Sequence, residues 1–176
     1  MSTESNHAQK GEVEIEIDFR RAVAGMEGLL CGGVYGGVAI ARELQLLFGS
    51  IAVRPFTLKS GRILNTESSE IALFVGDAAW RLEQGKRVLC SSTSGIGNES
   101  HMDLGVRRLK GRRVVGVQLV DVSFDLRLTF DSDIVLHIFC DQTNRDERAD
   151  NYSLMSGPDY FTVGSESVLL WAANKA

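Results

Sequence analysis

Two stretches of the chain carry the same pattern of acidic, apolar and aromatic residues. Glu43–Ser50 (ELQLLFGS) aligns without a gap with Asp125–Ser132 (DLRLTFDS), and both read acid, Leu, polar, Leu, any residue, Phe. Further matches pair Met26-Glu27-Gly28 with Leu109-Lys110-Gly111, Ser69–Val75 with Ser132–Ile138, Trp80-Arg81-Leu82 with Tyr152-Ser153-Leu154, and Gly85–Ser92 with Gly157–Gly164. Because internal repeats restrict the fold more than any single motif does, we predict two copies of one unit, at residues 20–92 and 103–165.

Each copy predicts about five short strands joined by turns, a meander whose inward positions are Leu, Ile, Val and Phe. Neither copy can bury its apolar face alone. We therefore expect the copies to pack about a pseudo-two-fold axis, as a sandwich or a partly open barrel. The predicted fold class is mainly β, in the sense of an α+β domain with one or two short helices.

The N-terminal part of the chain predicts a tail, a strand and a helix. Residues 1–11 lack periodic apolar positions and predict a flexible tail. The run Glu12–Phe19 alternates strictly between acidic and apolar residues, which predicts a half-exposed strand. Apolar residues three to four apart predict a short helix at Arg20–Gly28. A second short helix is expected at Leu104–Lys110, with Asp103 as its N-cap.

Size and composition favour one cytoplasmic domain over residues 12–176. A chain of 176 residues is long enough for one substantial core. The net charge of -4 argues against nucleic acid as the main partner, although a local basic patch is compatible with it. No apolar run reaches the ~20 residues needed to cross a bilayer, and no signal peptide is evident. Three cysteines without CxxC spacing predict reduced, mostly buried thiols.

The glycine-rich stretch Cys31–Val38 (CGGVYGGV) invites comparison with phosphate-binding loops, whose bare amides hold anions. It has neither the Lys-Ser/Thr ending of a P-loop nor the GxGxxG spacing. Moreover, Gly33 aligns with Gly116, which lies in a plain predicted strand. We interpret the stretch as a bulged or closely packed strand.

Two groups of residues carry side chains of the catalytic or metal-binding types. The segment Ser91–Asp103 has hydroxyls, a histidine and two carboxylates, but no GxSxG motif, and we interpret it as a linker between the copies. His137, Cys140 and Asp141 lie near one strand end, but no second His or Cys cluster completes a tetrahedral metal site. We therefore predict no catalytic residues, no metal site and no cofactor.

Two charged segments are candidate binding surfaces. The dense basic run consists of Arg107, Arg108, Lys110, Arg112 and Arg113. Within it, Arg107 and Arg108 are predicted contacts for an acidic partner, with a solvated surface as the alternative. The mixed-charge loop Asp141–Asp150 is net negative and can steer towards a basic partner, unless it is an ordinary surface loop. Its candidate binding residues are Asp141, Asp146, Glu147 and Asp150.

Three aromatic residues complete the candidates. The alignment pairs Trp80 with Tyr152, which predicts core packing near the pseudo-axis, and large aromatics there can also line a binding cleft. Trp171 follows the last repeated strand. It predicts either a closing strand or a contact between two copies of the chain in a homodimer.

The order of the strands resembles a known group of proteins. An apolar strand, an acid-Leu-polar-Leu-any-Phe strand and a later Trp or Tyr strand are similar to those of small bacterial domains of unknown function. Some of these domains look like immunity proteins of toxin systems. The resemblance covers most of Gly28–Ser165 and rests on structural motifs, so it implies a fold rather than an activity, and it carries no functional residues across.

The leading functional expectation is a non-catalytic module that binds another protein, in particular one that neutralises a bacterial toxin. The copies differ by the insertion Ile51–Ser68 and by the acidic loop, and such asymmetric additions are where a repeated scaffold acquires a specific surface. The alternative is a small enzyme or ligand carrier with a pocket between the copies, using His101, His137 or Asp141. Membrane association is not expected.

Overall fold

The computed structural model describes residues 10–36, 43–57, 60–94, 101–140 and 150–173 of the chain. Its helices are α1 (Glu12–Ala24) and α2 (His101–Val106), with the short 3₁₀ turns η2 (Arg107–Leu109) and η3 (Ser165–Ser167). Its strands are β1 (Cys31–Gly36), β2 (Leu44–Phe48), β3 (Ala52–Thr57), β4 (Ile63–Ser68), β5 (Ile71–Val75), β6 (Ala79–Gln84), β7 (Arg87–Ser91), β8 (Val114–Leu119), β9 (Leu126–Phe130), β10 (Ile134–Phe139), β11 (Asp150–Ser156), β12 (Asp159–Gly164) and β13 (Leu169–Ala173).

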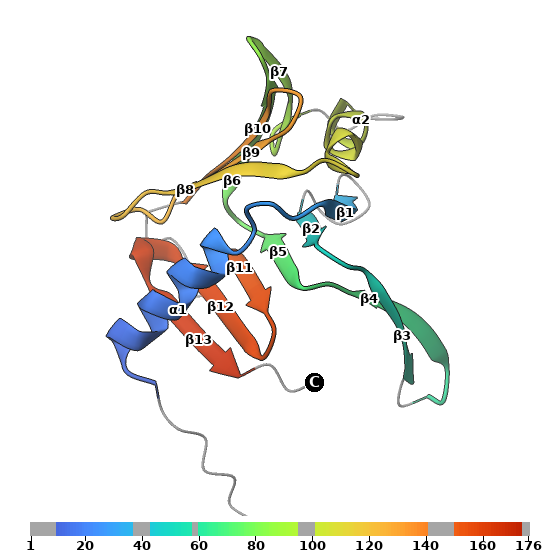
Figure 1. The fold of residues 1–176 in the computed structure, drawn as a ribbon, viewed down its shortest axis with the longest axis vertical. Helices are drawn as coiled ribbons and strands as arrows, with labels where there is room; N and C mark the ends of the chain where they lie inside the picture. Colours follow the sequence, from blue (N-terminus) through green and yellow to red (C-terminus); the bar gives the residue numbers. More distant parts are fainter. Residues whose placement is uncertain (1–9, 37–42, 58–59, 95–100, 141–149, 174–176) are drawn as a thin grey trace, which may run out of the picture.

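The strands form two large antiparallel sheets and one separate hairpin (Figure 1). One sheet has six strands in the order β1-β2-β5-β11-β12-β13, and the other has five in the order β7-β6-β10-β9-β8. The fold is mainly β, as predicted. Both sheets are open, so they do not form a closed barrel. The predicted insertion contains β3 and β4, which pair only with each other within the described residues and extend away from the two sheets (Figure 1).

The prediction of a meander within each half is wrong, because the chain changes sheet after β5. Strand β5 pairs with β11, and β6 pairs with β10, so consecutive strands β5 and β6 lie in different sheets. The connecting residues are held by backbone hydrogen bonds from Gly76 and Ala78 to the carbonyl of Asn151. The last hairpin of the first half, β6 and β7, therefore lies in the sheet that contains β8, β9 and β10. The last hairpin of the second half, β11 and β12, lies in the sheet that contains β1, β2 and β5.

The two sheets share the same pairing register at corresponding strands. Leu46 lies opposite Leu73 in the six-stranded sheet, and Leu128 lies opposite Leu136 in the five-stranded sheet. All four leucines are fully buried. Both β1 and β8 also carry a bulge at their second residue, within their pairing with β2 and β9.

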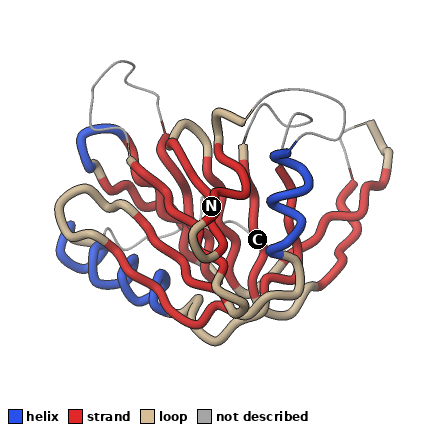
Figure 2. Tube along the Cα trace, turned by 90° about the horizontal axis from the view of Figure 1, so that it is seen from above, coloured by secondary structure: helices blue, strands red, loops and turns tan. Residues whose placement is uncertain are grey.

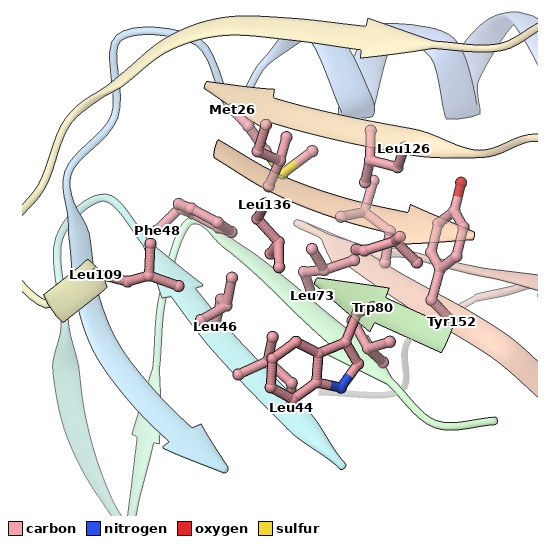
Figure 3. Close-up of a cluster of buried hydrophobic side chains, with 14 of the residues drawn as sticks. Met26, Leu44, Leu46, Phe48, Leu73, Trp80, Leu109, Leu126, Leu136 and Tyr152 are labelled. Atoms are coloured by element: carbon pink, nitrogen blue, oxygen red, sulfur yellow. The ribbon is translucent and has the colours of Figure 1, made fainter. Parts of the chain in front are cut away.

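The inner faces of the sheets meet in one hydrophobic core (Figure 3). Leu44, Leu46 and Leu73 from the six-stranded sheet point towards Leu126 and Leu136 from the other sheet (Figure 3). Since fully burying one such side chain contributes about 1.5–3 kcal/mol, this double layer is the main source of stability. The two helices flank the strands on opposite sides (Figure 2).

Residues Glu12–Phe19 belong to helix α1, so the strand predicted for them is wrong. The buried residues of the helix are Phe19, Ala22 and Val23, and they follow helical spacing. The ring centroid of Phe19 lies 5.7 Å from that of Phe161 on β12. A helix at this place covers the open side between the sheets, and this tertiary need overrides the local alternation of the sequence.

Helix α2 differs from its prediction by a few residues. It starts at His101 and is followed directly by η2, so Asp103 lies inside the helix and is not its N-cap. Met102, Val106 and Leu109 are buried against the core. The predicted helix is therefore present, but it begins earlier and ends in a tighter turn.

Lys10 belongs to the folded domain although the sequence predicts a tail there. Its ammonium lies 2.7 Å from an oxygen of Asp18 in α1 and 3.0 Å from an oxygen of Asp159 in β12. The indole nitrogen of Trp171 donates to the same Asp159 oxygen at 2.7 Å. Trp171 therefore takes the first of its two predicted roles, a half-buried residue of the closing strand β13.

The glycine-rich stretch is confirmed as a bulged, closely packed strand over its described part, residues 31–36. A side-chain carbon at Gly33 would lie only 3.0 Å from a methyl carbon of Leu47 on the neighbouring strand. No helix in the described part of the chain has the length and apolar character that crossing a bilayer requires.

Candidate functional site

The structure exposes a set of apolar side chains that no single segment of the sequence reveals. We call it the apolar ridge, and its members are Val13, Ile17, Val120, Val122 and Val168. Their exposed fractions lie between 46% and 83%. Exposed apolar side chains that lie singly are ordinary, but a contiguous group with a polar border is typical of an interaction surface.

Two contacts bring the three segments of the ridge together. The guanidinium of Arg20 on α1 donates to the carboxylate of Asp121 at 2.9 Å, which joins the helix to the loop after β8. The hydroxyl of Ser167 donates to the carbonyl of Val122 at 2.7 Å, which joins that loop to η3. A cavity of about 270 Å³ lies between α1 and η3, and it is lined by Glu12, Ile15, Glu16, Phe124, Ser167, Val168 and Leu169.

The backbone that presents the ridge is strained. Phe124, Glu166 and Ser167 have φ angles of +56°, +56° and +60°, in the left-handed region that non-glycine residues rarely adopt. Each such residue costs on the order of 1–3 kcal/mol, and strain of this kind clusters at functional surfaces. The hydroxyl of buried Tyr152 donates to the carbonyl of Phe124 at 2.9 Å and stabilises this conformation.

Carboxylates surround the apolar ridge. The exposed ones are Glu12, Glu14, Glu16, Asp121 and Glu166. Arg20 pairs with two of them, Glu16 and Asp121, and the other three make no ion pair within the described residues. Glu12 and Glu14 also lie in the first turn of α1, where negative charge is favourable in any case. The surface is therefore apolar at its centre and acidic at its border.

The predicted acidic loop is only partly described. Asp141, Asp146 and Glu147 lie outside the described residues. Asp150 is exposed at the start of β11. Its carbonyl accepts a hydrogen bond from the amide of Asp77 at 3.0 Å, so the end of this loop lies beside the connection between the two sheets.

Trp80 and Tyr152 are core residues and not surface contacts. Their exposed fractions are 2% and 1%, so neither side chain is available to a partner protein. This corrects their assignment as binding residues and supports the core role that the alignment predicts. Burial raises the pKa of the Tyr152 hydroxyl well above its ordinary value.

Arg107 and Arg108 are exposed, as a binding role requires. Both lie in η2, directly after α2. The guanidinium of Arg108 donates to the side-chain oxygen of Gln84 at 3.2 Å, so η2 lies against the end of β6. The structure thus brings the predicted basic run next to the turn between β6 and β7.

A cavity of about 450 Å³ lies between segments of the two halves. It is lined by Glu43, Leu44, Gln45, Phe74, Val75, Gly76, Asp77, Asp150, Tyr152 and Ser153. The histidines proposed for such a pocket are elsewhere. His137 lies on the five-stranded sheet with its Nε2 atom 3.5 Å from Glu83, and His101 is exposed at the start of α2.

The three cysteines are free thiols, as predicted. Cys31 and Cys90 are buried and Cys140 is half-buried. Burial raises the pKa of Cys31 and Cys140 to about 12 and that of Cys90 to about 11. Since the thiolate is the reactive form, these thiols are poor nucleophiles and poor metal ligands at neutral pH.

In the described part of the segment Ser91–Asp103, two serine hydroxyls accept hydrogen bonds from backbone amides. The amide of Trp80 donates to the hydroxyl of Ser92 at 3.2 Å, and the amide of Ser91 donates to the hydroxyl of Ser94 at 2.8 Å. Within the described residues, no group of three or more His, Cys, Asp or Glu is placed to hold a metal ion.

Sequence reasoning missed the apolar ridge because its members come from three distant segments. One signal was available: Val13 and Ile17 lie four residues apart, which places them on one face of a helix but would also suit the strand that was predicted. Comparison of the chain with protein-family models, with curated proteins and with solved structures finds no match.

Proposed function

We propose that this chain is a non-catalytic protein-binding module that docks through its apolar ridge. One observation carries the proposal: five exposed apolar side chains stand on three segments that hydrogen bonds hold together, and three residues of this backbone have left-handed φ angles. Covering such a surface with a partner removes apolar area from water and is favourable. Because carboxylates border the ridge, the fitting partner presents an apolar surface with a basic border.

Neutralisation of a bacterial toxin is the particular role that we propose, because some of the domains whose strand order this chain resembles look like immunity proteins. The geometry adds a condition to it. The toxin surface that is covered should have an apolar centre and lysine or arginine side chains around it, since these complement the ridge and its acidic border.

The test starts from a partner captured with the full chain from the source cell, followed by affinity measurement with both proteins purified. Val122→Asp should weaken the complex at least about tenfold, because a charge is placed at the centre of the buried surface. Val53→Asp is the matched control. Val53 is a similarly exposed valine on β3, away from the ridge, and its change should leave the affinity within about twofold.

The acidic loop is a competing surface, and charge reversal at Asp146 and Glu147 tests it. Unchanged affinity in that variant, together with a loss in Val122→Asp, assigns the contact to the ridge. Equal affinity of the wild type and Val122→Asp would overturn the ridge as the docking surface. Failure to capture any specific partner would remove support for the whole protein-binding proposal.

We also propose that the two halves are copies of one unit related by a pseudo-two-fold axis, with their last hairpins exchanged. Reciprocal backbone hydrogen bonds support this. The amide of Gly28 donates to the carbonyl of Val114 at 2.8 Å, and the amide of Gly111 donates to the carbonyl of Cys31 at 2.7 Å. Under the alignment, Gly28 corresponds to Gly111 and Cys31 to Val114, so the two bonds are equivalent.

The turns of the two exchanged hairpins support the same proposal. Gly85 between β6 and β7 has a φ angle of +57°, and Gly157 between β11 and β12 has a φ angle of +56°. Residues around each turn pair in the same register, Gln84 with Arg87 and Ser156 with Asp159. If the halves are copies, equivalent core positions should contribute equally to stability.

A small cationic ligand in the cavity of about 450 Å³ is the second candidate function. The cavity has the carboxylates of Glu43, Asp77 and Asp150 at its border and the ring of Phe74 in its lining, which suits a cation with an apolar part. A thermal-shift screen of cationic metabolites should raise the melting temperature of the wild type but not of Asp77→Asn/Asp150→Asn. A flat screen would remove this candidate.

A further inference from the structure

A basic patch lies at one end of the five-stranded sheet, before β8, whereas Val120 of the apolar ridge follows the other end of that strand. Its members are Lys86, Arg87, Arg107, Arg108, Lys110 and Arg112. All are exposed except Arg112, which is half-exposed. We infer that this basic patch binds the phosphate backbone of double-stranded nucleic acid without reading its sequence.

Tertiary contacts assemble the patch from three turns. Gln84, at the end of β6, accepts a hydrogen bond from Arg108 in η2 at 3.2 Å and donates to the carbonyl of Ser132 at 3.1 Å. The guanidinium of Arg112 donates to the hydroxyl of the same Ser132 at 2.8 Å. The β6–β7 turn, which carries Lys86 and Arg87, is therefore held beside η2 and the β9–β10 turn.

The patch is strongly positive although the chain has a net charge of -4. Six cationic side chains face two carboxylates in the same turns, those of Asp131 and Asp133. Asp131 lies 3.7 Å from Arg112, which leaves most of the positive charge without a partner in the patch. A local surplus of this size raises the concentration of anionic polymers at the surface and speeds their association.

The fold that the two halves share does not require basic residues at the positions of the patch. This step rests on the proposed duplication. The aligned positions in the other half, in the order given above, are Pro158, Asp159, Ala24, Gly25, Glu27 and Leu29. None of these is basic, although the hairpin turns that carry the first two positions pair in the same register, Gln84 with Arg87 and Ser156 with Asp159. The cations therefore belong to a surface that one half has and the other lacks.

The composition of the patch favours phosphate as the anion. Four of its six members are arginines, whose planar guanidinium forks match phosphate oxygens in pairs. The patch contains no aromatic side chain, whereas proteins that bind single strands stack the bases on aromatic rings. Contacts to the backbone of a duplex carry no sequence information directly, so the expected binding is independent of sequence.

The test is fluorescence anisotropy of a labelled duplex of about 20 base pairs, titrated with the full chain in about 50 to 200 mM salt. We expect dissociation constants of about 1 to 100 μM, with log K falling linearly with log salt by about 0.9 for each phosphate neutralised. Arg87→Gln/Arg107→Gln should weaken binding at least about fivefold and reduce the steepness of that line by up to about 1.8.

The matched control is Arg62→Gln/Arg127→Gln, which removes two exposed arginines outside the patch and should change neither quantity. No anisotropy change with the wild type at the lowest salt, or an equal loss in the control variant, would overturn the inference. Tighter binding of polyglutamate than of the duplex at equal salt would also overturn it and would assign the patch to an acidic protein.

The outcome is separable from that of the proposed protein binding. Val122→Asp should bind the duplex as the wild type does, and Arg87→Gln/Arg107→Gln should retain the protein partner. Loss of both activities in either variant would indicate a folding defect, which the melting temperature of each variant shows independently.

Discussion

Leu30 and Arg113 form an isolated antiparallel bridge at the corner where β1 and β8 begin. Strand β1 is an edge of the six-stranded sheet and β8 is an edge of the five-stranded sheet. The amide of Cys31 donates to the carbonyl of Arg112 at 2.7 Å, and the amide of Val114 donates to that of Leu29 at 2.9 Å. The two sheets are therefore joined at this bridge by two hydrogen bonds, one donated from each side.

Equal loss of stability is expected from Leu46→Ala and Leu128→Ala. Both side chains are fully buried at corresponding places of the two sheets. Each change removes buried methyl groups and leaves a cavity, which costs about 2–5 kcal/mol of unfolding free energy. Urea unfolding of both variants should give values within about 1 kcal/mol of each other. A difference of several kcal/mol would contradict the proposed equivalence of the halves.

Gly105→Ala should destabilise the protein although alanine normally favours a helix over glycine. Gly105 lies in α2 against β7, and a new side-chain carbon would meet the sulfur of Cys90 and approach its Cβ atom at 2.9 Å. We expect a loss of about 1–3 kcal/mol from overpacking. Adding Cys90→Ala should restore part of the loss, because it removes the sulfur.

Gly116→Ala is the control for that experiment. At this position in β8 the nearest atom to a new side-chain carbon would be the Cβ atom of Thr129 at 3.7 Å, an ordinary contact. The change should be neutral or stabilising by up to about 1 kcal/mol, because it reduces the freedom of the unfolded chain. Equal effects at Gly105 and Gly116 would contradict the close packing of α2 on β7.

Tyr152→Phe should cost about 1 kcal/mol of unfolding free energy, because it leaves the carbonyl of Phe124 with only the weak hydrogen bond from the Cys140 thiol at 3.5 Å. Tyr160→Phe is the matched control, since the Tyr160 hydroxyl makes no hydrogen bond within the described residues. Chemical unfolding of both variants measures the difference. Because Phe124 anchors the loop that presents Val122, the first change should also weaken binding of the protein partner.

The Lys10–Asp18 pair should make stability depend on pH at both extremes. The hydrogen bond that Lys10 donates to Asp18 is the main cause that raises the pKa of Lys10 above 10.5. Its contribution to stability is complete below pH 10.5 and is lost as pH rises through the raised value. The hydrogen bond from Lys10 is the main cause that lowers the pKa of Asp18 below 3.8. Its contribution is present above pH 3.8 and is lost as pH falls through the lowered value.

Melting temperatures across this range measure the effect. Lys10→Met should lower the melting temperature at neutral pH and flatten its decline above about pH 10.5, where the wild type loses the same interaction. Asp18→Asn should flatten the decline below about pH 3.8. Parallel pH profiles for the wild type and both variants would show that the pair does not contribute to folding stability.

Strands could be predicted wherever their own residues define one apolar face. Leu126, Leu128 and Phe130 alternate with polar residues along β9, and all three are buried as that pattern predicts. The same pattern in Leu44–Phe48 marks β2. Local alternation is sufficient at these places, because each strand is central in its sheet and must bury that face.

Alternation misled the prediction at Glu12–Phe19, because the same residues also place Val13 and Ile17 on one helical face. Which period applies depends on what lies beside the segment, and here that is the open side between two sheets. The pairing of β5 with β11 was equally beyond prediction. Strand partners are chosen by contacts between distant segments, and many arrangements bury the same apolar residues.

By itself, the amino-acid sequence determined the strands of both halves, their inward residues and the free state of the thiols, since each depends on neighbours along the chain. Only the tertiary structure decided the exchange of hairpins, the helix at residues 12–24, the apolar ridge and the gathering of Lys86 and Arg87 with Arg107. These depend on which distant segments pack together, and that choice minimises the free energy of the whole core rather than of any one segment.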